Sequence, residues 1–390
     1  MRIVRAGWRT FRVPLRRPLA TAHGAIHERR GLLVSLEDEL GHVGQGEAAP
    51  LVDLGTEDEA ACRMAIEAAL SAWVDARSAD EAAGRAMPDS RTPCARAALD
   101  GALADLAARR AGQALAAWLR ARAGLAGAPA EQVAVQALVS GEKPEAVAAS
   151  ARAARSEGFG AFKLKLAVEP GRVDLGRDLE RVAALREAAG PAARLRLDAN
   201  EAFDRVQARA ACRAFAVHRI DLLEQPLARD DVEGLAALTR EGLVPIAADE
   251  ALSGTGLEAC LAARAADVFV VKPAAAGGAS TAIGIARRAA EVSIEIVWSS
   301  LIETEVGLGT ALALAAALAP SATGSAACVQ GLGTADWLAC GLGGRVSGPR
   351  PVAGRLAVPS TPGLGLSLAP AWSIEGEVFE GEARVYGSGA

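Results

Sequence analysis

Apolar and polar positions alternate in two different ways along this 390-residue chain, and the change divides it into regions. Near the N-terminus, strand-like runs at Leu32–Leu36 and His42–Gly46 are joined by a charged turn, EDELG. A helical pattern, with apolar positions three and four residues apart, follows from Thr56 to Ala123. These features predict a small α+β domain over residues 1–125.

After a Gly-, Ala- and Pro-rich segment at 124–132, strand-like runs alternate with helical ones. The strand candidates are Val133–Leu138, Ala161–Leu166, Arg194–Asp198, Asp221–Glu224, Pro245–Ala248, Val268–Val271 and Ile294–Trp298, with an eighth near Gln330. Such alternation is typical of a parallel α/β barrel, for which about 200–250 residues suffice. We predict a barrel domain over residues 126–330, and a C-terminal segment, 331–390, that finishes the barrel and packs on the first domain.

Three carboxylates and one lysine each close one of these apolar runs. Asp198, Glu224 and Asp249 are separated by 26 and 25 residues, and another 23 residues lead to Lys272. Each interval is about the length of one strand-plus-helix unit, so these side chains should meet at the mouth of the barrel. The three carboxylates are therefore candidate ligands of one metal ion.

Two further lysines, Lys163 and Lys165, lie two residues apart in the second barrel strand candidate. On an extended strand both side chains point to the same face. Phe162 and Leu164 indicate that the other face is buried. A lysine inside a barrel is costly unless it has a use, so we expect this pair to be catalytic.

The chemistry of these groups favours carbanion formation. Three carboxylates without a nearby His or Cys ligand prefer Mg²⁺ or Mn²⁺ over zinc. A divalent cation stabilises the enediolate that forms when a proton is removed α to a carboxylate, so a small-molecule carboxylate is the expected substrate. An amine base needs its pKa lowered toward 7, and the cation field at Lys163 and Lys165 would do so. Lys272 can act as an acid or stabilise negative charge from the opposite face.

Composition narrows the other classes of function. The formal net charge is −5, the 42 basic residues are scattered and only 4% of residues are aromatic, which argues against nucleic-acid binding. The six cysteines show no CxxC spacing, and we find neither a signal-like apolar segment at the N-terminus nor a convincing membrane span. We therefore expect a cytoplasmic protein without a membrane partner. Homo-oligomerisation stays open, because one sequence does not reveal symmetric association.

Seven short motifs together carry a family resemblance. They are GHVGQGEAAP in the first domain, KLK at 163–165, DAN at 198–200, EQP at 224–226, DE at 249–250, VKP at 271–273 and SSLIETEVG at 299–307. This set resembles the enolase superfamily, in its muconate-lactonising-enzyme subgroup. The resemblance implies a (β/α)7β modified TIM barrel of the α/β class, with an N-terminal α+β capping domain that the C-terminal segment completes. The capping loops, around Pro18–His27 and Ala48–Gly55, should close on the substrate.

The same resemblance assigns roles to residues. Lys165 is expected to be the base, with Lys272 on the opposite face of the substrate. Residues expected to orient the metal ligands or contact the substrate are Asn200, Gln225, Glu250 and Glu303.

The substrate is harder to predict, because the same groups serve dehydration, epimerisation, racemisation and cycloisomerisation. GEAAPL at 46–51, SSLIETEVGLG at 299–309 and GLGTADWL at 331–338 are similar to o-succinylbenzoate synthases, the dehydratases of menaquinone biosynthesis. A dipeptide epimerase should carry a DxD-type element between the seventh and eighth strands. SSLIETEVG is not that element, although Glu303 and Glu305 are acidic. A dipeptide epimerase or N-acylamino acid racemase is therefore the first alternative, followed by a muconate cycloisomerase.

Simpler explanations exist for single residues. An Asp at a strand end is most often a helix N-cap or turn residue, and Lys272 alone could be a surface lysine. A Schiff-base aldolase could use Lys165 or Lys272 without a metal, but it leaves the three carboxylates unexplained. A barrel without catalytic activity would have no reason to keep both of these lysines and all three carboxylates.

Overall fold

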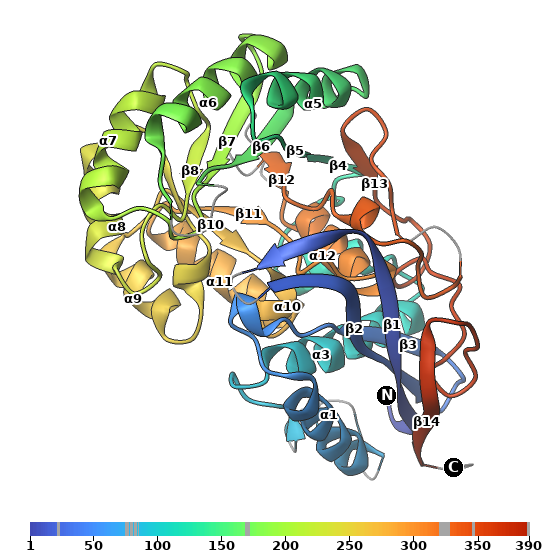
Figure 1. Ribbon diagram of the computed structural model, residues 1–390. Helices are drawn as coiled ribbons and strands as arrows, with labels where there is room; N and C mark the ends of the chain where they lie inside the picture. The colour runs from blue at the N-terminus through green and yellow to red at the C-terminus, as the bar shows by residue number, and fades with distance from the viewer. Residues whose placement is uncertain are drawn as a thin grey trace.

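The computed structural model describes the chain except residues 22–23, 75–77, 79–80, 82–83, 85, 168–171, 320–327, 345–347 and 388–390. Part of the first predicted capping loop, residues 22–23, therefore lies outside the described residues. Figure 1 shows an antiparallel sheet in blue and red lying beside a barrel of strands and helices. None of the described helices is long and apolar enough to cross a membrane.

The first sheet has four strands in the order β14-β1-β2-β3. β1 (Ile3–Thr21) and β2 (Gly24–Asp38) form a long hairpin, and β3 (Val43–Ala48) pairs with β2. β14 (Phe379–Gly387) pairs with the free side of β1, so the last strand of the chain completes the sheet that the first strand begins.

Helices cover one face of this sheet, and two glycines set the distance. The 3₁₀ turn η1 (Val52–Leu54) and helices α1 (Glu59–Trp73), α3 (Pro93–Arg110) and α4 (Leu115–Arg122) follow β3. A Cβ atom at Gly46 would lie 1.9 Å from the carbonyl oxygen of Ala98, and one at Gly44 would lie 2.3 Å from that of Ala102. The glycines of VGQGE therefore let α3 pack directly on the backbone of β3.

Seven parallel strands form the wall of the barrel in chain order. They are β5 (Ala137–Val139), β6 (Ala161–Lys165), β7 (Arg194–Asp198), β8 (Leu222–Glu224), β9 (Ile246–Ala248), β10 (Val268–Val271) and β11 (Glu295–Trp298). The helices between and after them are α5 (Pro144–Ser156), α6 (Leu175–Ala189), α7 (Arg205–Ala216), α8 (Val232–Glu241), η2 (Glu250–Leu252), α9 (Gly256–Ala263), α10 (Pro273–Ala276), α11 (Ala279–Glu291) and α12 (Glu305–Ala317). The predicted (β/α)7β fold class is confirmed, and the strand bounds agree with the sequence pattern to within about two residues.

The eighth strand, predicted near Gln330, is β12 (Val329–Gln330), and it closes the barrel. Gly331 N donates to the carbonyl oxygen of Trp298 in β11 at 2.7 Å, and Gln136 N donates to that of Gln330 at 3.1 Å. The first strand, predicted as one run, divides at Gln136 into β4 (Gln132–Val135) and β5. The reason is a change of partner, because β4 pairs with β12 and with β13 (Arg355–Ala357), whereas β5 pairs with β6.

Strand alternation sends side chains into two apolar layers. Phe162 and Leu164 of β6 belong to the large core between strands and helices. The barrel interior holds a separate, small cluster made of Leu222, Ala247, Val268, Val270 and Val297. The inward residue two positions further along each strand therefore reaches the mouth of the barrel. The predicted domain limits at residues 125 and 330 remain predictions.

The β1–β2 hairpin extends to the segment that follows the eighth strand, at the 3₁₀ turn η4 (Ala335–Trp337). Ala339 N donates to the carbonyl oxygen of Pro14 at 2.9 Å, and Arg16 Nε donates to that of Leu338 at 2.9 Å. The guanidinium of Arg17 lies 4.2 Å from the centre of a Trp337 ring. These contacts hold the hairpin against the barrel.

Candidate active site

The ionisable residues predicted from the sequence lie at one end of the barrel. Asp198 and Glu224 are the last residues of β7 and β8, while Asp249 and Lys272 directly follow β9 and β10. Each lies two residues beyond an inward-facing position of its strand, such as Leu222 before Glu224. The alternation of the strand therefore carries these side chains to the mouth.

Lys163 lies at the centre of the cluster. Its Nζ is 2.8 Å from Asp198 Oδ2 and 2.7 Å from Glu224 Oε1, and its side chain is 11% exposed. Lys272 forms an ion pair with Asp249, with both side chains largely buried. The structure thus brings the three carboxylates together around two ammonium groups, and Lys272 is no surface lysine.

The buried charges shift one another's pKa values. Burial alone would lower the pKa of Lys163, but the charges of Asp198 and Glu224 outweigh it and the pKa is raised. The pKa of Lys272 is raised in the same way, because burial lowers it but Asp249, Glu250 and Glu224 together outweigh that effect. For Glu224, burial and the neighbouring charge of Asp198 raise the pKa to about 8. Both lysines are therefore ammonium ions at neutral pH when they hold the carboxylates.

Lys165 differs from its neighbour on β6. Its side chain is exposed, whereas that of Lys163 is partly buried. It pairs in register with Asp198 of β7, and its charge helps to lower the pKa of that carboxylate. Lys165 therefore lies next to the cluster on its open side.

Lysine is rare in this chain, and its distribution is informative. Only four of the 42 basic residues are lysines, and three of them, Lys163, Lys165 and Lys272, belong to this cluster. Arginine remains charged at any pH a protein meets, whereas lysine can lose its proton when its surroundings favour the neutral form. The chain uses arginine for nearly every other basic position, so the cluster holds three of the few basic side chains that can lose a proton.

Three polar residues next to the carboxylates hold the cluster in shape. Gln225 is fully buried, and its Oε1 accepts from Asp249 N at 3.0 Å and from Ala251 N at 3.1 Å. Asn200 has a φ of 41°, a left-handed conformation that asparagine tolerates, and its Nδ2 donates to Glu250 Oε1 at 3.1 Å. These contacts fix the loops that carry the carboxylates.

The chemistry of the cluster fits a divalent cation. Among the described residues, no three His, Cys, Asp or Glu side chains already form a coordination group, because Lys163 and Lys272 hold the carboxylate oxygens. The donor set itself consists of hard oxygen ligands, as Mg²⁺ prefers. The Oε2 atom of Glu250, next to Asp249, is buried without a hydrogen-bond partner. A cation at this place would be a partner for this oxygen.

Glu303 and Glu305, in the segment after β11, make contacts of their own. Glu303 is 2% exposed, and its Oε2 accepts from Leu301 N at 2.6 Å. Its charge acts on Arg29 and Glu47 of the first domain, which places it at the junction of the two domains. Glu305 begins α12, is 7% exposed and accepts from Gly343 N at 3.2 Å.

Two residues of this junction were missed at the sequence level, namely Arg29 and Glu47. Both are almost fully buried. Glu47 lies in the motif GHVGQGEAAP, which was the only available signal, and nothing in the local pattern distinguishes Arg29 from the many other arginines.

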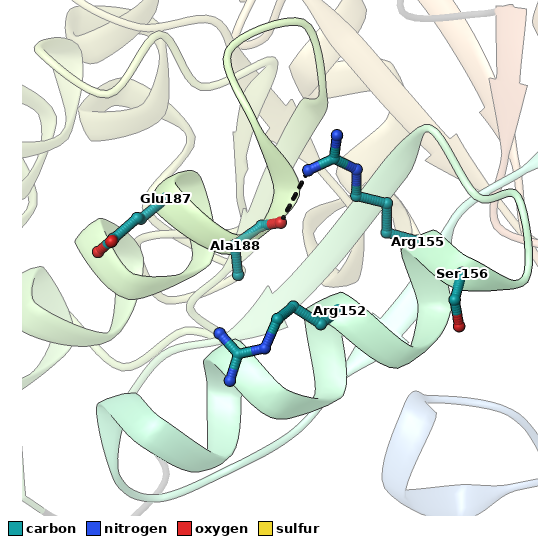
Figure 2. Close-up of a pocket in the computed structure, with 5 residues that line it drawn as sticks. All are labelled: Arg152, Arg155, Ser156, Glu187 and Ala188. Atoms are coloured by element: carbon teal, nitrogen blue, oxygen red, sulfur yellow. Dashed lines mark hydrogen bonds between the residues drawn. The ribbon is translucent and has the colours of Figure 1, made fainter.

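A hollow on the outside of the barrel is a separate feature (Figure 2). It is lined by Arg152, Arg155 and Ser156 from α5 and by Glu187 and Ala188 from α6, and Arg155 Nη1 donates to the carbonyl oxygen of Ala188 at 3.4 Å. The C-terminal ends of these helices lead into the beginnings of β6 and β7. The hollow therefore lies toward the end of the barrel opposite the carboxylates.

Comparison with known families identifies both parts of the chain. Residues 146–372 match the family model described as "Enolase C-terminal domain-like", and residues 5–97 match "MenC, N-terminal domain". The first match covers more than half of the chain.

Individual relatives agree with this result. The chain is 31% identical to L-Ala-D/L-Glu epimerase of Bacillus subtilis over 81% of this chain and 85% of the relative. It is 39% identical to o-succinylbenzoate synthase of Thermobifida fusca, over 48% of this chain and 56% of that protein. A solved structure of dipeptide epimerase from Enterococcus faecalis, complexed with Mg and the dipeptide L-Leu-L-Tyr, superposes with a TM-score of 0.79 at 27% identity. That superposition covers 94% of this chain and 99% of the epimerase chain. Together with the curled parallel sheet and its capping domain, these matches show that the chain belongs to the enolase superfamily, in the subgroup that includes muconate cycloisomerases, o-succinylbenzoate synthases and dipeptide epimerases.

Proposed function

We propose that this protein removes a proton α to a carboxylate of a small-molecule substrate with the help of Mg²⁺, and that the overall reaction is the dehydration that forms o-succinylbenzoate. The observation that carries the proposal is the arrangement of Lys163, Lys165 and Lys272 around the three carboxylates. Lysines from the second and sixth strands face one site from two sides, as removal of a proton and stabilisation of the resulting charge require.

The carboxylates Asp198, Glu224 and Asp249 would hold the metal ion. When bound, Mg²⁺ supplies positive charge that stabilises a developing dianion. Gln225 and Asn200 keep the loops of these ligands in place through the hydrogen bonds described above.

The two lysines of β6 divide the work between them. Lys163 is held by two carboxylates and remains an ammonium ion, so it contributes charge. Lys165 is exposed at the mouth and is the side chain that can reach a substrate carbon. We assign Lys165 as the base and Lys272, on the opposite side, as the group that stabilises negative charge or returns a proton.

In the dehydration, Lys165 takes the α proton, and the electron pair of the broken C–H bond ends in a new C=C bond. The β C–O bond breaks, and the leaving hydroxide becomes water with the proton held by Lys165. The ring becomes aromatic, which drives the elimination and leaves little else for the protein to supply.

The choice of dehydration over dipeptide epimerisation is supported by where the acidic residues lie. A bound dipeptide has an ammonium group that needs a carboxylate near the seventh or eighth strand. Glu303 Oε2 accepts from Leu301 N, and Glu305 Oε1 accepts from Gly343 N, while Glu305 Oε2 has no partner among the described residues. The residues directly after β12, 331–335, carry no charge, and Asp336, the first acidic residue beyond them, is paired with Arg350. The match of the first domain to the MenC N-terminal model points the same way.

Epimerisation remains the second candidate because the B. subtilis L-Ala-D/L-Glu epimerase aligns over most of the chain. Racemisation of N-acylamino acids would use the same lysines, on the two faces of the substrate. Neither reaction needs a different base.

The test is to incubate the purified protein and Mg²⁺ with the cyclohexadiene precursor of o-succinylbenzoate and follow the loss of diene absorbance. Lys165→Ala should abolish turnover, whereas Lys143→Ala, a matched change at the N-cap of α5, should not alter it. Failure of the wild-type protein to turn over the precursor would contradict the dehydration. Exchange of α protons with deuterated water on N-succinylamino acids or dipeptides would then assign racemisation or epimerisation.

A further inference from the structure

The loop Ala48–Gly55 is joined to the barrel by a buried glutamate at its root. Glu47, the penultimate residue of β3, is 4% exposed. Its Oε1 accepts from Thr304 N at 2.9 Å, and its Oε2 accepts from Thr304 Oγ1 at 2.6 Å and from Gly307 N at 2.8 Å. A residue of the first domain thus caps the N-terminus of α12, a barrel helix, whose own N-cap residue, Thr304, makes no side-chain cap.

The contact depends on a glycine. A Cβ atom at Gly307 would lie 3.2 Å from Glu47 Oε2 and 2.6 Å from the Cβ of Glu303. Any larger residue would push the two carboxylates away from the helix end. The SSLIETEVG motif therefore contains the space that Glu47 fills.

A buried arginine ties the same two segments together from β2. Arg29 is 2% exposed, and its Nη2 and Nη1 donate to the carbonyl oxygens of Ala49 at 2.5 Å and Pro50 at 3.3 Å. Its Nε donates to the carbonyl oxygen of Ile302 at 3.3 Å. One guanidinium thus holds both the loop after β3 and the loop after the seventh barrel strand, β11.

The loop after β11 is held in an unfavourable conformation. Ile302 has a φ of 61°, which is rare for a β-branched residue. Its N–H donates to Ser300 Oγ at 3.3 Å, and Ser300 Oγ lies 2.7 Å from Thr334 Oγ1 in the loop after the eighth strand. Contacts on both sides of Ile302 therefore oppose relaxation of the backbone.

We propose that Arg29 and Glu47 are positioning residues that couple the loop Ala48–Gly55 to the segment Ser299–Thr304. The inference rests on the proposed function, because it assigns these two segments to the surface that faces the substrate. Neither residue reaches the lysines or carboxylates of the cluster. They act by keeping two loops from different domains in one fixed relation, so that the site closes around the substrate in a single geometry.

The first experiment measures amide hydrogen exchange in wild type, Arg29→Lys and Glu47→Gln. Lysine keeps the positive charge but cannot donate to three carbonyl groups in a fixed fork, and the amide nitrogen of glutamine cannot accept from Thr304 or Gly307. Both variants should exchange at least tenfold faster in residues 48–55 and in residues 299–304. This measurement needs no substrate.

A matched control separates positioning from loss of stability. Arg186 also donates to several carbonyl oxygens, those of His218, Gly190, Ala193 and Arg219, but at the end of the barrel opposite the mouth. Arg186→Lys should lower Tm and leave exchange in both mouth segments unchanged.

The second experiment measures kcat and KM for the substrate that the wild-type protein turns over. Arg29→Lys should lower kcat/KM at least tenfold, with both constants changed, while Arg186→Lys leaves them within twofold of wild type. Unchanged exchange in either mouth segment, or faster exchange with unaltered kcat/KM, would overturn the proposal.

If Arg29→Lys does not fold, Glu47→Gln decides by the same criteria. A wild type that does not turn over the cyclohexadiene precursor refutes only the dehydration, because the exchange result still judges the coupling.

Discussion

Replacing Arg196 with methionine should weaken the fold and strengthen metal binding at the same time. Arg196 lies on β7, two residues before Asp198 on the same face, and it is 1% exposed. Its Nη1 donates to Gln136 Oε1 at 2.8 Å, and its Nε donates to Asp221 Oδ2 at 3.1 Å. It is thus a buried cation directly below the carboxylate cluster, and methionine would fill much of the space without the charge.

The loss of stability can be worked from these contacts. Gln136 Oε1 would lose a buried donor, which costs about 1–3 kcal/mol. Asp221 would keep Arg194, whose Nε and Nη2 donate to its Oδ1 at 3.0 and 2.6 Å, so no uncompensated buried charge remains. We therefore expect the free energy of unfolding without metal to fall by about 2–4 kcal/mol. This is at the low end of the cost of breaking a buried ion pair.

The effect on the metal has the opposite sign. Residues two apart on a strand are separated by about 7 Å, and unit charges at that distance interact by about 2 kcal/mol at an effective dielectric constant of 20. Removing the cation makes the cluster more negative, so Mg²⁺ should bind at least about tenfold more tightly. Thermal unfolding in EDTA and over a MgCl₂ titration measures both effects. Arg186→Met serves as the control for loss of a partly buried arginine whose hydrogen bonds lie at the other end of the barrel.

Two results would refute this reasoning. A loss of stability that is equal with and without Mg²⁺ would mean that Arg196 does not act on the cluster through its charge. A titration midpoint at higher Mg²⁺ concentration would mean that Arg196 shapes the ligands rather than repelling the ion.

Three further predictions test other parts of the structure. Burial raises the pKa of Glu47 from 4.5 to about 7, so the folded protein binds this proton more tightly than the unfolded chain does. Relative to Glu47→Gln, wild type should lose about 3 kcal/mol of unfolding free energy as pH rises from 4.5 through 7, measured by urea unfolding across this range. Gly46→Ala should lower the free energy of unfolding by about 3 kcal/mol or more, because its Cβ would lie 1.9 Å from the Ala98 carbonyl oxygen. Gly101→Ala in the facing helix, where the nearest atoms are 3.8 Å away, should be neutral or stabilising. Urea unfolding measures both, and equal effects would contradict the packing argument. Trp337→Leu removes the cation–π contact with Arg17 and should cost about 0.5–2 kcal/mol, so proteolysis of the β1–β2 hairpin should become faster, and an unchanged rate would show that the backbone contacts suffice.

The barrel could be predicted from sequence because the features that specify it lie close together along the chain. Each strand is a short apolar run that ends in one functional residue, as at Asp198 and Glu224, and parallel strands bring those ends together whatever the helices between them contain. The position of Lys163 between two carboxylates follows from the same regularity. The choice of Lys165 as the base depends on the family resemblance and stays a proposal.

The features that escaped prediction depend on residues far apart in the chain. β1 contains arginines and prolines, which are not typical of strands, and it is stabilised by pairing with β2 and with β14. The break at Gln136 exists because its backbone bonds to Gln330, about 190 residues away. The surroundings of Glu303, in its own loop and near Arg29, depend on how the two domains pack together. No local sequence pattern predicts that packing.

The pairing of β1 with β14 also constrains synthesis of the protein. Arg5 faces Gly387 across this sheet, so the ribosome must make almost the whole chain before β1 receives its second neighbour. At about 5–20 residues per second, that interval lasts roughly 20–80 s. During this time one edge of β1 presents free backbone groups, on which another nascent chain could add a strand. The arginines along β1, among them Arg9 and Arg12, put charge beside that edge and would discourage such pairing until β14 emerges.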